Sequence, residues 1–459
     1  MLRGRRPRRG NSLREIALSR EMIPGSELPS EPNLDIPAAE TIQYRCPGDP
    51  TDISSAVHLS RLASFYHKCQ LCEHRHEVSR LAPAVQSRWA QLSSTSEPVR
   101  LFQSNGIRGR YLNRVTRHEA TQIAAVFAST LREVVEFWRS ERKQLPVNRW
   151  LKVAFGHDSR PSSADLAIAA AASLRQHGCE VWDLGVTVRP QLDAAIREAA
   201  LDGAFLVTGH GSPVGWNGFD LIGPDGVIWS LGGMLDVVEQ RFHEPCPRAD
   251  REAAPDQPYD AVRLAAERVR RSLHGVRPIP IEISCRAPVV LEVLEQTRSD
   301  WPGTLSLRDS QFACPASESP VPPELAFEIA EDGVAVQILE YGRTAISPDR
   351  VLHGLGVMLL DEHPHVDVVL SDPLFEQLQW TVQRCGPGYL VAHQGGQTEE
   401  SLIRTMRSLA APLAADGQGR FWIRQGAQIM GDALETIVLV LKSMSRSDQS
   451  PDLWGRERP

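Results

Sequence analysis

The 459-residue sequence contains no long hydrophobic run. No uninterrupted apolar stretch approaches the roughly 18 residues that a membrane-spanning helix needs, so we expect no membrane partner. The N-terminus also lacks the apolar region of a secretory signal, because its first ten residues contain five arginines and no acid. Residues 1–41 show little apolar patterning, and we interpret them as a disordered basic tail. Since no longer basic stripe follows, a nucleic-acid partner is not expected.

Cysteine is scarce as well. Eight cysteines in a chain of this length do not form a disulfide framework, and most of them stand alone in unrelated contexts. We therefore expect a reducing, cytoplasmic location. Hydrophobic residues make up 42% of the chain and charged residues 23%, which is ordinary for a globular protein. At roughly 150 residues per domain the length predicts about three domains and excludes a single small module.

Cysteine and histidine nevertheless gather in residues 42–99, which we expect to form a small N-terminal module. Cys69 and Cys72 are separated by two residues and can present both sulfurs to one ion, and Cys46 and His58 would complete a tetrahedral zinc site. A closed set of four ligands indicates a structural zinc ion. A redox-active C-x-x-C pair and ordinary thiols stay open as alternatives. The histidine ligand is open too, because three more histidines lie nearby: His67, His74 and His76.

From Leu101 onward, short apolar runs alternate with longer helical periods, which is typical of βαβ units. Residues 150–155 predict a buried strand, and residues 164–178 predict a helix that ends at a glycine. Residues 179–185 predict the next strand. A second helix at 190–201 and a third strand at 202–209 complete a doubly wound unit, in which ligands usually bind at the carboxyl ends of the strands.

Two more α/β units are expected further on. The second unit has a strand at 276–284, a helix at 287–297 and a β-hairpin at 326–342. The third begins with a strand at 366–372, and residues 373–386 predict its helix. Between the first and second units we expect a linker, because one segment is rich in proline and charge: residues 244–258.

Four segments, in this order, resemble signatures of the α-D-phosphohexomutase family, which contains phosphoglucomutases and phosphomannomutases. LFQSNGIRGRYL (101–112) resembles F-G-T-D-G-I-R-G, and GHDSRPSS (156–163) resembles G-x-D-T-R-x-S-S. VTGHGSPVGWNGFDLIGPDG (207–226) resembles the serine loop T-A-S-H-N-P-x-x-x-N-G-F-K, and IMGDALETIVLVLKSM (429–444) resembles the closing T-G-D-G motif. On this basis the sequence is identified as a member of the family.

The resemblance implies a fold of three phosphohexomutase-like α/β/α domains after the N-terminal module. We expect domain I at 100–245, a shortened domain II at 259–345 and domain III at 346–445, followed by a tail at 446–459. The family's fourth domain, which carries a phosphate-binding loop, is expected to be absent.

In the family, a phosphoserine exchanges its phosphoryl group with a hexose phosphate, aided by a magnesium ion held by three aspartates. Aligning Thr208 and Pro213 with the ends of the serine-loop motif places His210 at the serine position and Ser212 two residues later. The family's lysine becomes Asp220, which we expect to repel a substrate phosphate. Three correctly spaced carboxylates cannot be drawn from the acids of the expected metal loop, so we expect no magnesium. Those acids are Glu328, Glu331 and Asp332.

The family's sugar-recognition loop aligns with residues 415–420, where Asp416 keeps one acid and Arg420 replaces the histidine. Arg108 and Arg160, which match arginines near the family's active centre, remain. The resemblance implies that these three arginines and Asp416 bind an anion such as a sugar phosphate. The alternative is that these residues only stabilise turns and domain contacts. The same alternative applies to the other retained motif residues: Asn217, Gly218, Gly431 and Asp432.

These departures favour a catalytically inactive homologue that binds a sugar phosphate or acts as a regulatory or interaction protein. An active phosphotransferase using His210 or Ser212 is the first alternative. It requires the reactive atom to move, and a misplacement of about 1 Å can already cost 100-fold in rate. The second alternative is an interaction protein whose basic tail and zinc-like module meet a protein partner.

Overall fold

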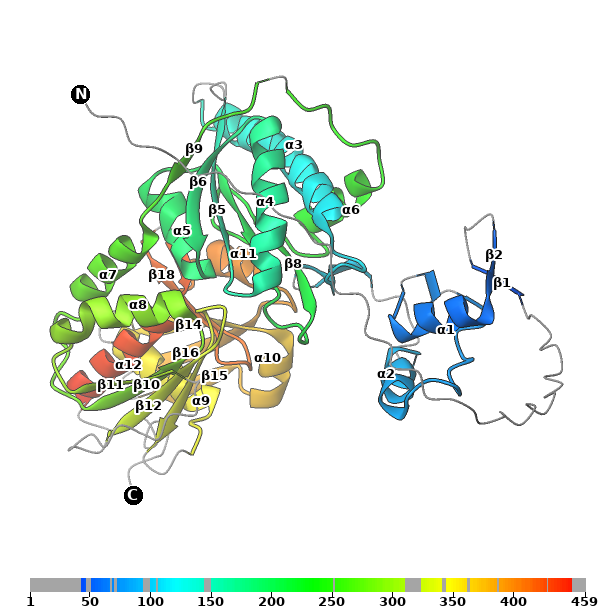
Figure 1. Cartoon of the computed structure of the whole chain (residues 1–459). Helices are drawn as coiled ribbons and strands as arrows, with labels where there is room; N and C mark the ends of the chain where they lie inside the picture. Colours follow the sequence, from blue (N-terminus) through cyan, green and yellow to red (C-terminus); the bar gives the residue numbers. More distant parts are fainter. Residues whose placement is uncertain are drawn as a thin grey trace, which may run out of the picture. The chain divides into compact units, whose positions relative to one another are not determined.

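The structure, a computed structural model, describes thirteen stretches of the chain: residues 43–46, 51–66, 68–69, 72–93, 100–104, 106–143, 150–250, 252–309, 323–340, 344–360, 364–385, 388–426 and 428–447. The chain divides into two compact units, Met1–Ser96 and Glu97–Pro459 (Figure 1). The predicted basic tail at 1–41 lies outside the described residues, as does the predicted C-terminal tail from residue 448 onward. No helix in the described stretches is long and apolar enough to cross a membrane.

The first unit consists of a β-hairpin and two helices around a small core. Leu62, Cys69 and Trp89 pack together in this core, and the Trp89 indole N–H donates a hydrogen bond to the Leu62 carbonyl oxygen at 2.7 Å. The Ser54 hydroxyl oxygen accepts a bond from the Val57 N–H, which satisfies a free donor at the start of α1. The elements are β1 (Gln43–Arg45), β2 (Asp52–Ser54), α1 (Ser55–Ala63) and α2 (Pro83–Ser93).

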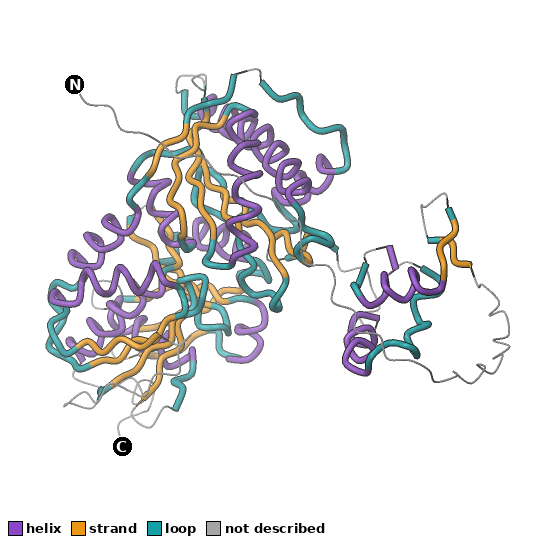
Figure 2. Tube along the Cα trace, in the orientation of Figure 1, coloured by secondary structure: helices purple, strands orange, loops and turns teal. Residues whose placement is uncertain are grey.

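In the second unit, strands lie between helices (Figure 2). A seven-stranded sheet with the order β3-β4-β8-β7-β5-β6-β9 forms the first domain. Alternate residues of its central strands enter two separate cores, because successive side chains of a strand point to opposite faces. Helices α3, α4 and α6 cover one face and α5 covers the other, which gives three layers. The strands are β3 (Phe102–Gln103), β4 (Gly106–Arg110), β5 (Leu151–His157), β6 (Cys179–Val186), β7 (Gly203–Val207), β8 (Trp216–Ile222) and β9 (Asp256–Pro258). The helices are α3 (Arg117–Glu141), α4 (Pro161–Gln176), α5 (Arg189–Glu198) and α6 (Met234–Phe242).

The second and third domains have a four-stranded sheet, β11-β10-β12-β13, and a six-stranded sheet, β15-β16-β14-β17-β18-β19. One continuous apolar core joins them, and α7, α9 and α12 contribute to it. The second domain contains α7 (Ala261–Ser272), β10 (Ile281–Cys285), α8 (Pro288–Thr297), the 3-10 turn Arg298–Asp300, β11 (Leu305–Asp309), β12 (Leu325–Ile329) and β13 (Val336–Glu340). The third contains α9 (Pro348–Leu360), β14 (His365–Leu370), α10 (Asp372–Leu378), β15 (Val382–Cys385), β16 (Gly388–Gln394), α11 (Glu399–Leu409), β17 (Leu413–Ala415), β18 (Phe421–Gln425), β19 (Gln428–Gly431) and α12 (Ala433–Ser447).

The three sheets repeat one strand order. In each, a first strand (β5, β10 or β14) pairs in parallel with the second and third, and a fourth strand runs antiparallel to the third. The connection between the third and fourth strands is therefore equivalent in all three domains. These connecting turns are residues 208–215, 330–335 and 416–420.

The strands and helices predicted over residues 150–209, in the first α/β domain, are confirmed. The β-hairpin predicted at 326–342 is confirmed as well. The helix predicted over 373–386 is wrong in its second half. Gln379 adopts a left-handed conformation (φ 53°) that ends α10, and β15 then fills the free edge of β16. The segment at 244–258 does not act as a linker throughout, because its last three residues form β9 and pair with the edge strand β6.

Candidate functional site

The three equivalent turns meet and form the candidate site. His210 comes from the β7–β8 turn, Asp332 from the β12–β13 turn and Arg420 from the β17–β18 turn. The second and third turns also bond through their backbones, since the Val336 N–H donates to the Gly419 carbonyl oxygen at 2.9 Å. The topological repeat thus brings together side chains that are far apart in the sequence.

His210, Asp332 and Arg420 form one ion-pair network. His210 Nε2 lies 3.0 Å from Asp332 Oδ2, and Arg420 Nη2 lies 3.3 Å from the same oxygen. The other oxygen, Oδ1, accepts hydrogen bonds from the backbone N–H groups of Val334 and Ala335. Burial alone would raise the pKa of Asp332, but the hydrogen bond and charge of His210 and the charge of Arg420 lower it well below its usual range. The carboxylate is therefore held ionised and fully bonded.

Neither nitrogen of the His210 imidazole is accessible to a reacting phosphoryl group. Nε2 faces Asp332, while Nδ1 is buried and has no hydrogen-bond partner in the described part of the chain. Ser212 is partly exposed, and among the described residues no side chain forms a hydrogen bond with its hydroxyl. A serine nucleophile needs a base within hydrogen-bond reach. The structure provides neither residue with the geometry of an activated nucleophile.

Asp158 fixes the backbone of the His210 turn. Its carboxylate accepts bonds from the Thr208 hydroxyl at 3.0 Å and the Gly209 N–H at 2.9 Å. The Thr208 hydroxyl in turn accepts the His210 N–H at 3.0 Å. A Cβ at Gly209 would lie 2.1 Å from Arg160 Nη1, so the close approach of that guanidinium requires glycine. The sequence analysis missed Asp158, although its place directly after the parallel strand β5 is where functional residues gather.

Arg108 and Asp220 form a buried ion pair behind this turn, with Nη2 and Oδ1 2.7 Å apart. Arg108 is 3% exposed and also donates to the carbonyl oxygens of His210 and Phe219. The expectation that Asp220 repels a substrate phosphate is therefore wrong in this structure, because Arg108 neutralises the carboxylate in place. Arg108 was expected to bind an anion, but its guanidinium N–H groups already bond to Asp220 and to the two backbone carbonyl oxygens.

Arg420 and Asp416 lie within the third turn. The Asp416 carboxylate accepts the backbone N–H groups of Gln418 and Arg420, and burial raises the pKa of Asp416. Arg420 Nη1 is 3.8 Å from Asp416 Oδ2, and its Nε is buried without a hydrogen-bond partner among the described residues. The arrangement orients Arg420 toward Asp332 rather than toward solvent.

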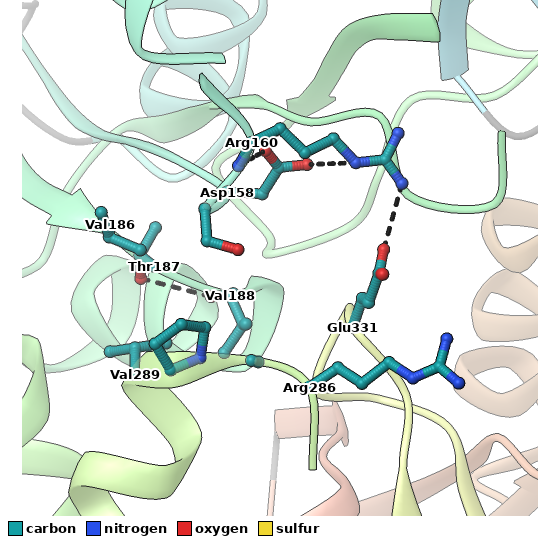
Figure 3. Close-up of a pocket in the computed structure, with 11 residues that line it drawn as sticks. Asp158, Arg160, Val186, Thr187, Val188, Arg286, Val289 and Glu331 are labelled. Carbon is teal, nitrogen blue, oxygen red and sulfur yellow. Dashed lines mark hydrogen bonds and ion pairs between the residues drawn. The ribbon is translucent and has the colours of Figure 1, made fainter. Parts of the chain in front are cut away.

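Arg160 lies at the junction of the first and second domains. Its Nη2 pairs with Glu331 Oε2 at 3.0 Å, and Nε lies 3.6 Å from Asp158 (Figure 3). Beyond this pair opens a cleft of about 580 Å³, lined by side chains from all three turns and by Arg286. Ser212 lines the same cleft. The cleft thus presents two guanidinium groups, the carboxylates of Glu328 and Glu331, and several neutral polar groups.

A second, smaller cavity of about 150 Å³ lies on the other side of the network. Arg189 enters it, pairing with Glu399 at 2.7 Å and with Asp193 at 3.0 Å. Burial opposes the charge of Arg189, but the two carboxylates outweigh it and raise the pKa of Arg189. The i,i+4 spacing of Arg189 and Asp193 was visible in the sequence, whereas the partner from α11 was not.

The acids at the family's magnesium-loop position do not fit a magnesium ion. Asp332 is bonded to a histidine and an arginine, and Glu331 is bonded to Arg160. Magnesium requires near-octahedral oxygen coordination, and here it would have to displace the side chains that already bond to these carboxylates.

Retained motif residues hold the scaffold. Asn217 donates to the hydroxyls of Ser162 and Ser163 at 2.7 and 2.8 Å. A Cβ at Gly218 would lie only 1.7 Å from the Ile107 carbonyl oxygen, so the approach of β4 to β8 requires glycine. The Asp432 carboxylate accepts the Leu434 N–H at the start of α12 and pairs with an arginine of α7, Arg268.

In the N-terminal unit, Cys46, Cys69 and Cys72 are all buried. Burial raises the pKa of Cys69 to about 11, and the nearby thiols of Cys46 and Cys72 contribute in the same direction. His58 is buried too, but it stacks on Tyr44, and its Nε2 lies 4.0 Å from the Glu77 carboxylate without a hydrogen bond. Across the described residues, no three histidine, cysteine or acidic side chains are arranged around one metal position. His67 lies outside the described residues.

Comparison with known proteins agrees with the repeated α/β/α architecture. A family model described as phosphoglucomutase/phosphomannomutase, alpha/beta/alpha domain I, matches residues 99–232. A phosphoglucomutase/phosphomannomutase of Thermococcus kodakarensis is 28% identical over 150 residues, which are 33% of this chain and 30% of the relative. A phosphoglucosamine mutase of Synechococcus elongatus is 29% identical over 135 residues, 29% of this chain and 26% of the relative. The chain thus spans less than a third of the length of these curated relatives.

Two solved structures share the fold over most of the chain. One is a phosphoglucomutase/phosphomannomutase family protein from Burkholderia thailandensis, with a TM-score of 0.60, 19% identity and coverage of 77% of this chain and 78% of that one. The other is the parafusin phosphoglucomutase from Paramecium, with a TM-score of 0.52, 11% identity and coverage of 75% and 70%. The class is therefore a multidomain α/β/α protein with the phosphohexomutase fold. Together with the domain I match, residues 99–232 thus resemble the first domain of phosphoglucomutases and phosphomannomutases, and the rest of the chain shares their fold.

Proposed function

We propose that this chain is a non-catalytic phosphohexomutase homologue that binds a sugar phosphate without transferring its phosphoryl group. The observation that carries the proposal is the His210–Asp332–Arg420 network. It occupies the three turns that in the family hold the nucleophile, the metal ligands and the sugar-recognition loop. An ionised carboxylate that already bonds to His210, Arg420 and two backbone N–H groups has no coordination left for a metal ion.

The cleft beside the network supports the binding part of the proposal. Its volume of about 580 Å³ lies within the range of roughly 300 to 1,000 Å³ typical of small-molecule sites. Arg160 and Arg286 line it, and arginine binds phosphate through paired hydrogen bonds. Ser284, Gln337 and Gln418 add neutral hydrogen-bonding groups suited to sugar hydroxyls.

Titration calorimetry with glucose 1-phosphate and mannose 1-phosphate tests the binding part. We expect saturable binding that weakens at least tenfold in Arg160→Gln. A matched control is Arg241→Gln, which removes an ion pair with Glu133 away from the cleft and should leave the affinity unchanged. Absence of binding in the unaltered protein would refute this part of the proposal.

Intact-mass measurement tests the non-catalytic part. Phosphohexomutases work through a phosphorylated enzyme, so a working nucleophile would carry a phosphoryl group after incubation with a hexose bisphosphate. We expect no added mass of that size on the full-length protein. A phosphoryl adduct localised to the β7–β8 turn would favour an active phosphotransferase instead.

We also propose that the N-terminal module holds a structural zinc ion and offers a surface to a protein partner. Three buried thiols and a buried imidazole with an unbonded Nε2 supply donors that zinc prefers. Zinc binding would require these side chains to turn toward one point and would satisfy the orphaned His58 nitrogen. Such reduced thiols agree with the cytoplasmic location that we expect.

A further inference from the structure

A polar groove of about 440 Å³ lies where α5, α7 and α12 meet, away from the His210 network. Four cationic side chains line it, against two carboxylates. Arg197 comes from the last turn of α5, Arg268 and Arg271 from α7, and Lys442 from α12. Elements of the first, second and third domains therefore face one another across the groove.

Arg197 is the unusual member of this set. Its side chain is only partly exposed, yet within the described part of the chain its guanidinium has no ion pair and no hydrogen bond. Burial lowers the pKa of Arg197, and the nearby charge of Arg268 lowers it further against the opposing effect of Asp193. A desolvated cation without a carboxylate partner is unfavourable unless something else balances it.

Arg268 also has an unused donor. Its Nη2 pairs with Asp432, but its Nη1 is buried and makes no hydrogen bond with any described residue. The carboxylates of the groove do not satisfy these donors: Glu435 accepts bonds from Ser272 and Gln425, and Glu198 is exposed. Arg197 thus lines the groove without a bond to any described residue, and Arg268 keeps a buried, unbonded Nη1 beside it.

We propose that this groove is a binding site for a phosphate dianion, either free or as a phosphomonoester. A tetrahedral oxyanion in the groove can accept from Arg197, and Arg268, Arg271 and Lys442 add positive charge around it. Because the ligands come from α5, α7 and α12, a bound phosphate would link the first domain to the other two. The site is separate from the sugar-phosphate cleft and does not depend on the function proposed for it.

Calorimetric titration of the full-length protein with inorganic phosphate, and with AMP as a phosphomonoester, tests this proposal at constant ionic strength. We expect saturable binding of at least one of the two, weakened at least tenfold in Arg197→Gln and also reduced in Arg271→Gln. Arg263→Gln is the matched control, because Arg263 lies on α7 but pairs with Glu267 outside the groove. Failure of both probes to bind, or equal affinity in Arg197→Gln, would overturn the proposal.

Two further measurements separate binding from scaffold effects. Without phosphate, Arg197→Gln should melt at the same temperature as the unaltered protein or higher, because the variant removes an unpaired desolvated charge. A melting temperature lowered by several degrees would show that Arg197 supports the fold, which contradicts the proposal. Arg160→Gln, altered in the other cleft, should retain phosphate affinity, and loss of it there would place the phosphate in that cleft instead.

Discussion

Replacing Asp332 by asparagine removes the charge that holds the three turns together. The carboxylate lies between His210 and Arg420, and its side chain is 11% exposed. Removing one member of a buried ion pair costs about 3 to 5 kcal/mol. We take the lower end, about 3 kcal/mol, because asparagine can still accept hydrogen bonds and Arg420 is partly exposed. At roughly 2 °C per kcal/mol for a large unit, the melting temperature should fall by about 6 °C.

Glu331→Gln is the matched control, since Glu331 lies in the same turn but its ion pair with Arg160 is more exposed. Exposed pairs contribute about 0 to 1 kcal/mol, so this variant should differ little from the unaltered protein. Calorimetry or urea unfolding of both variants measures the two differences. An Asp332→Asn protein as stable as the control would refute the role of the network.

The pH dependence gives the same prediction a second test. The folded-state pKa of Asp332 is lowered, so its carboxylate stabilises the fold above the unfolded pKa of about 4 and loses this effect as the pH falls toward the folded value. The stability difference between the unaltered protein and Asp332→Asn should therefore be full at pH 7 and narrow below about pH 4. A difference that stays constant down to pH 3 would argue against an ionised carboxylate.

Two further predictions concern the module and the scaffold. Elemental analysis should find about one zinc ion per chain, lost in Cys69→Ser and kept in Cys246→Ser, whose thiol is exposed; zinc-free unaltered protein would contradict the proposed site. Gly218→Ala should destabilise by about 3 kcal/mol, because its Cβ would meet the Ile107 carbonyl oxygen at 1.7 Å. Gly215→Ala, at φ 85° in open space, should cost only about 1 kcal/mol, and equal urea midpoints for the two variants would refute the steric argument.

Sequence periodicity was enough to predict the repeated α/β units, because buried parallel strands and amphipathic helices differ in period and length. It could not predict that α10 ends at Leu378, since the free edge of β16 decides whether residues 382–385 form a strand. The linker prediction at 244–258 failed at its end for the same reason. Residues 256–258 form β9 only because they pair with the edge strand β6.

The sequence predicted single residues of the candidate site, but it did not predict which of their side chains pair with one another. The sequence placed His210 in a loop after a predicted strand and Arg420 in a loop aligned with the family's sugar-recognition loop, and both residues lie in turns between strands. That Asp332 joins them depends on three domains packing together, which no local pattern encodes. Arg108 and Asp220 were both noted, but only the pairing of β4 with β8 brings their charges together. Interactions distant in sequence therefore decide whether a charge repels a ligand or is neutralised.

Turnover of hexose phosphates measures the central claim most directly. The full-length protein would be incubated with glucose 1-phosphate or mannose 1-phosphate, magnesium and the corresponding bisphosphate, and the 6-phosphate product followed by phosphorus NMR. We predict no product above the protein-free background, with the same result for His210→Ala and Ser212→Ala. Clear turnover in the unaltered protein, abolished by either substitution, would contradict the account.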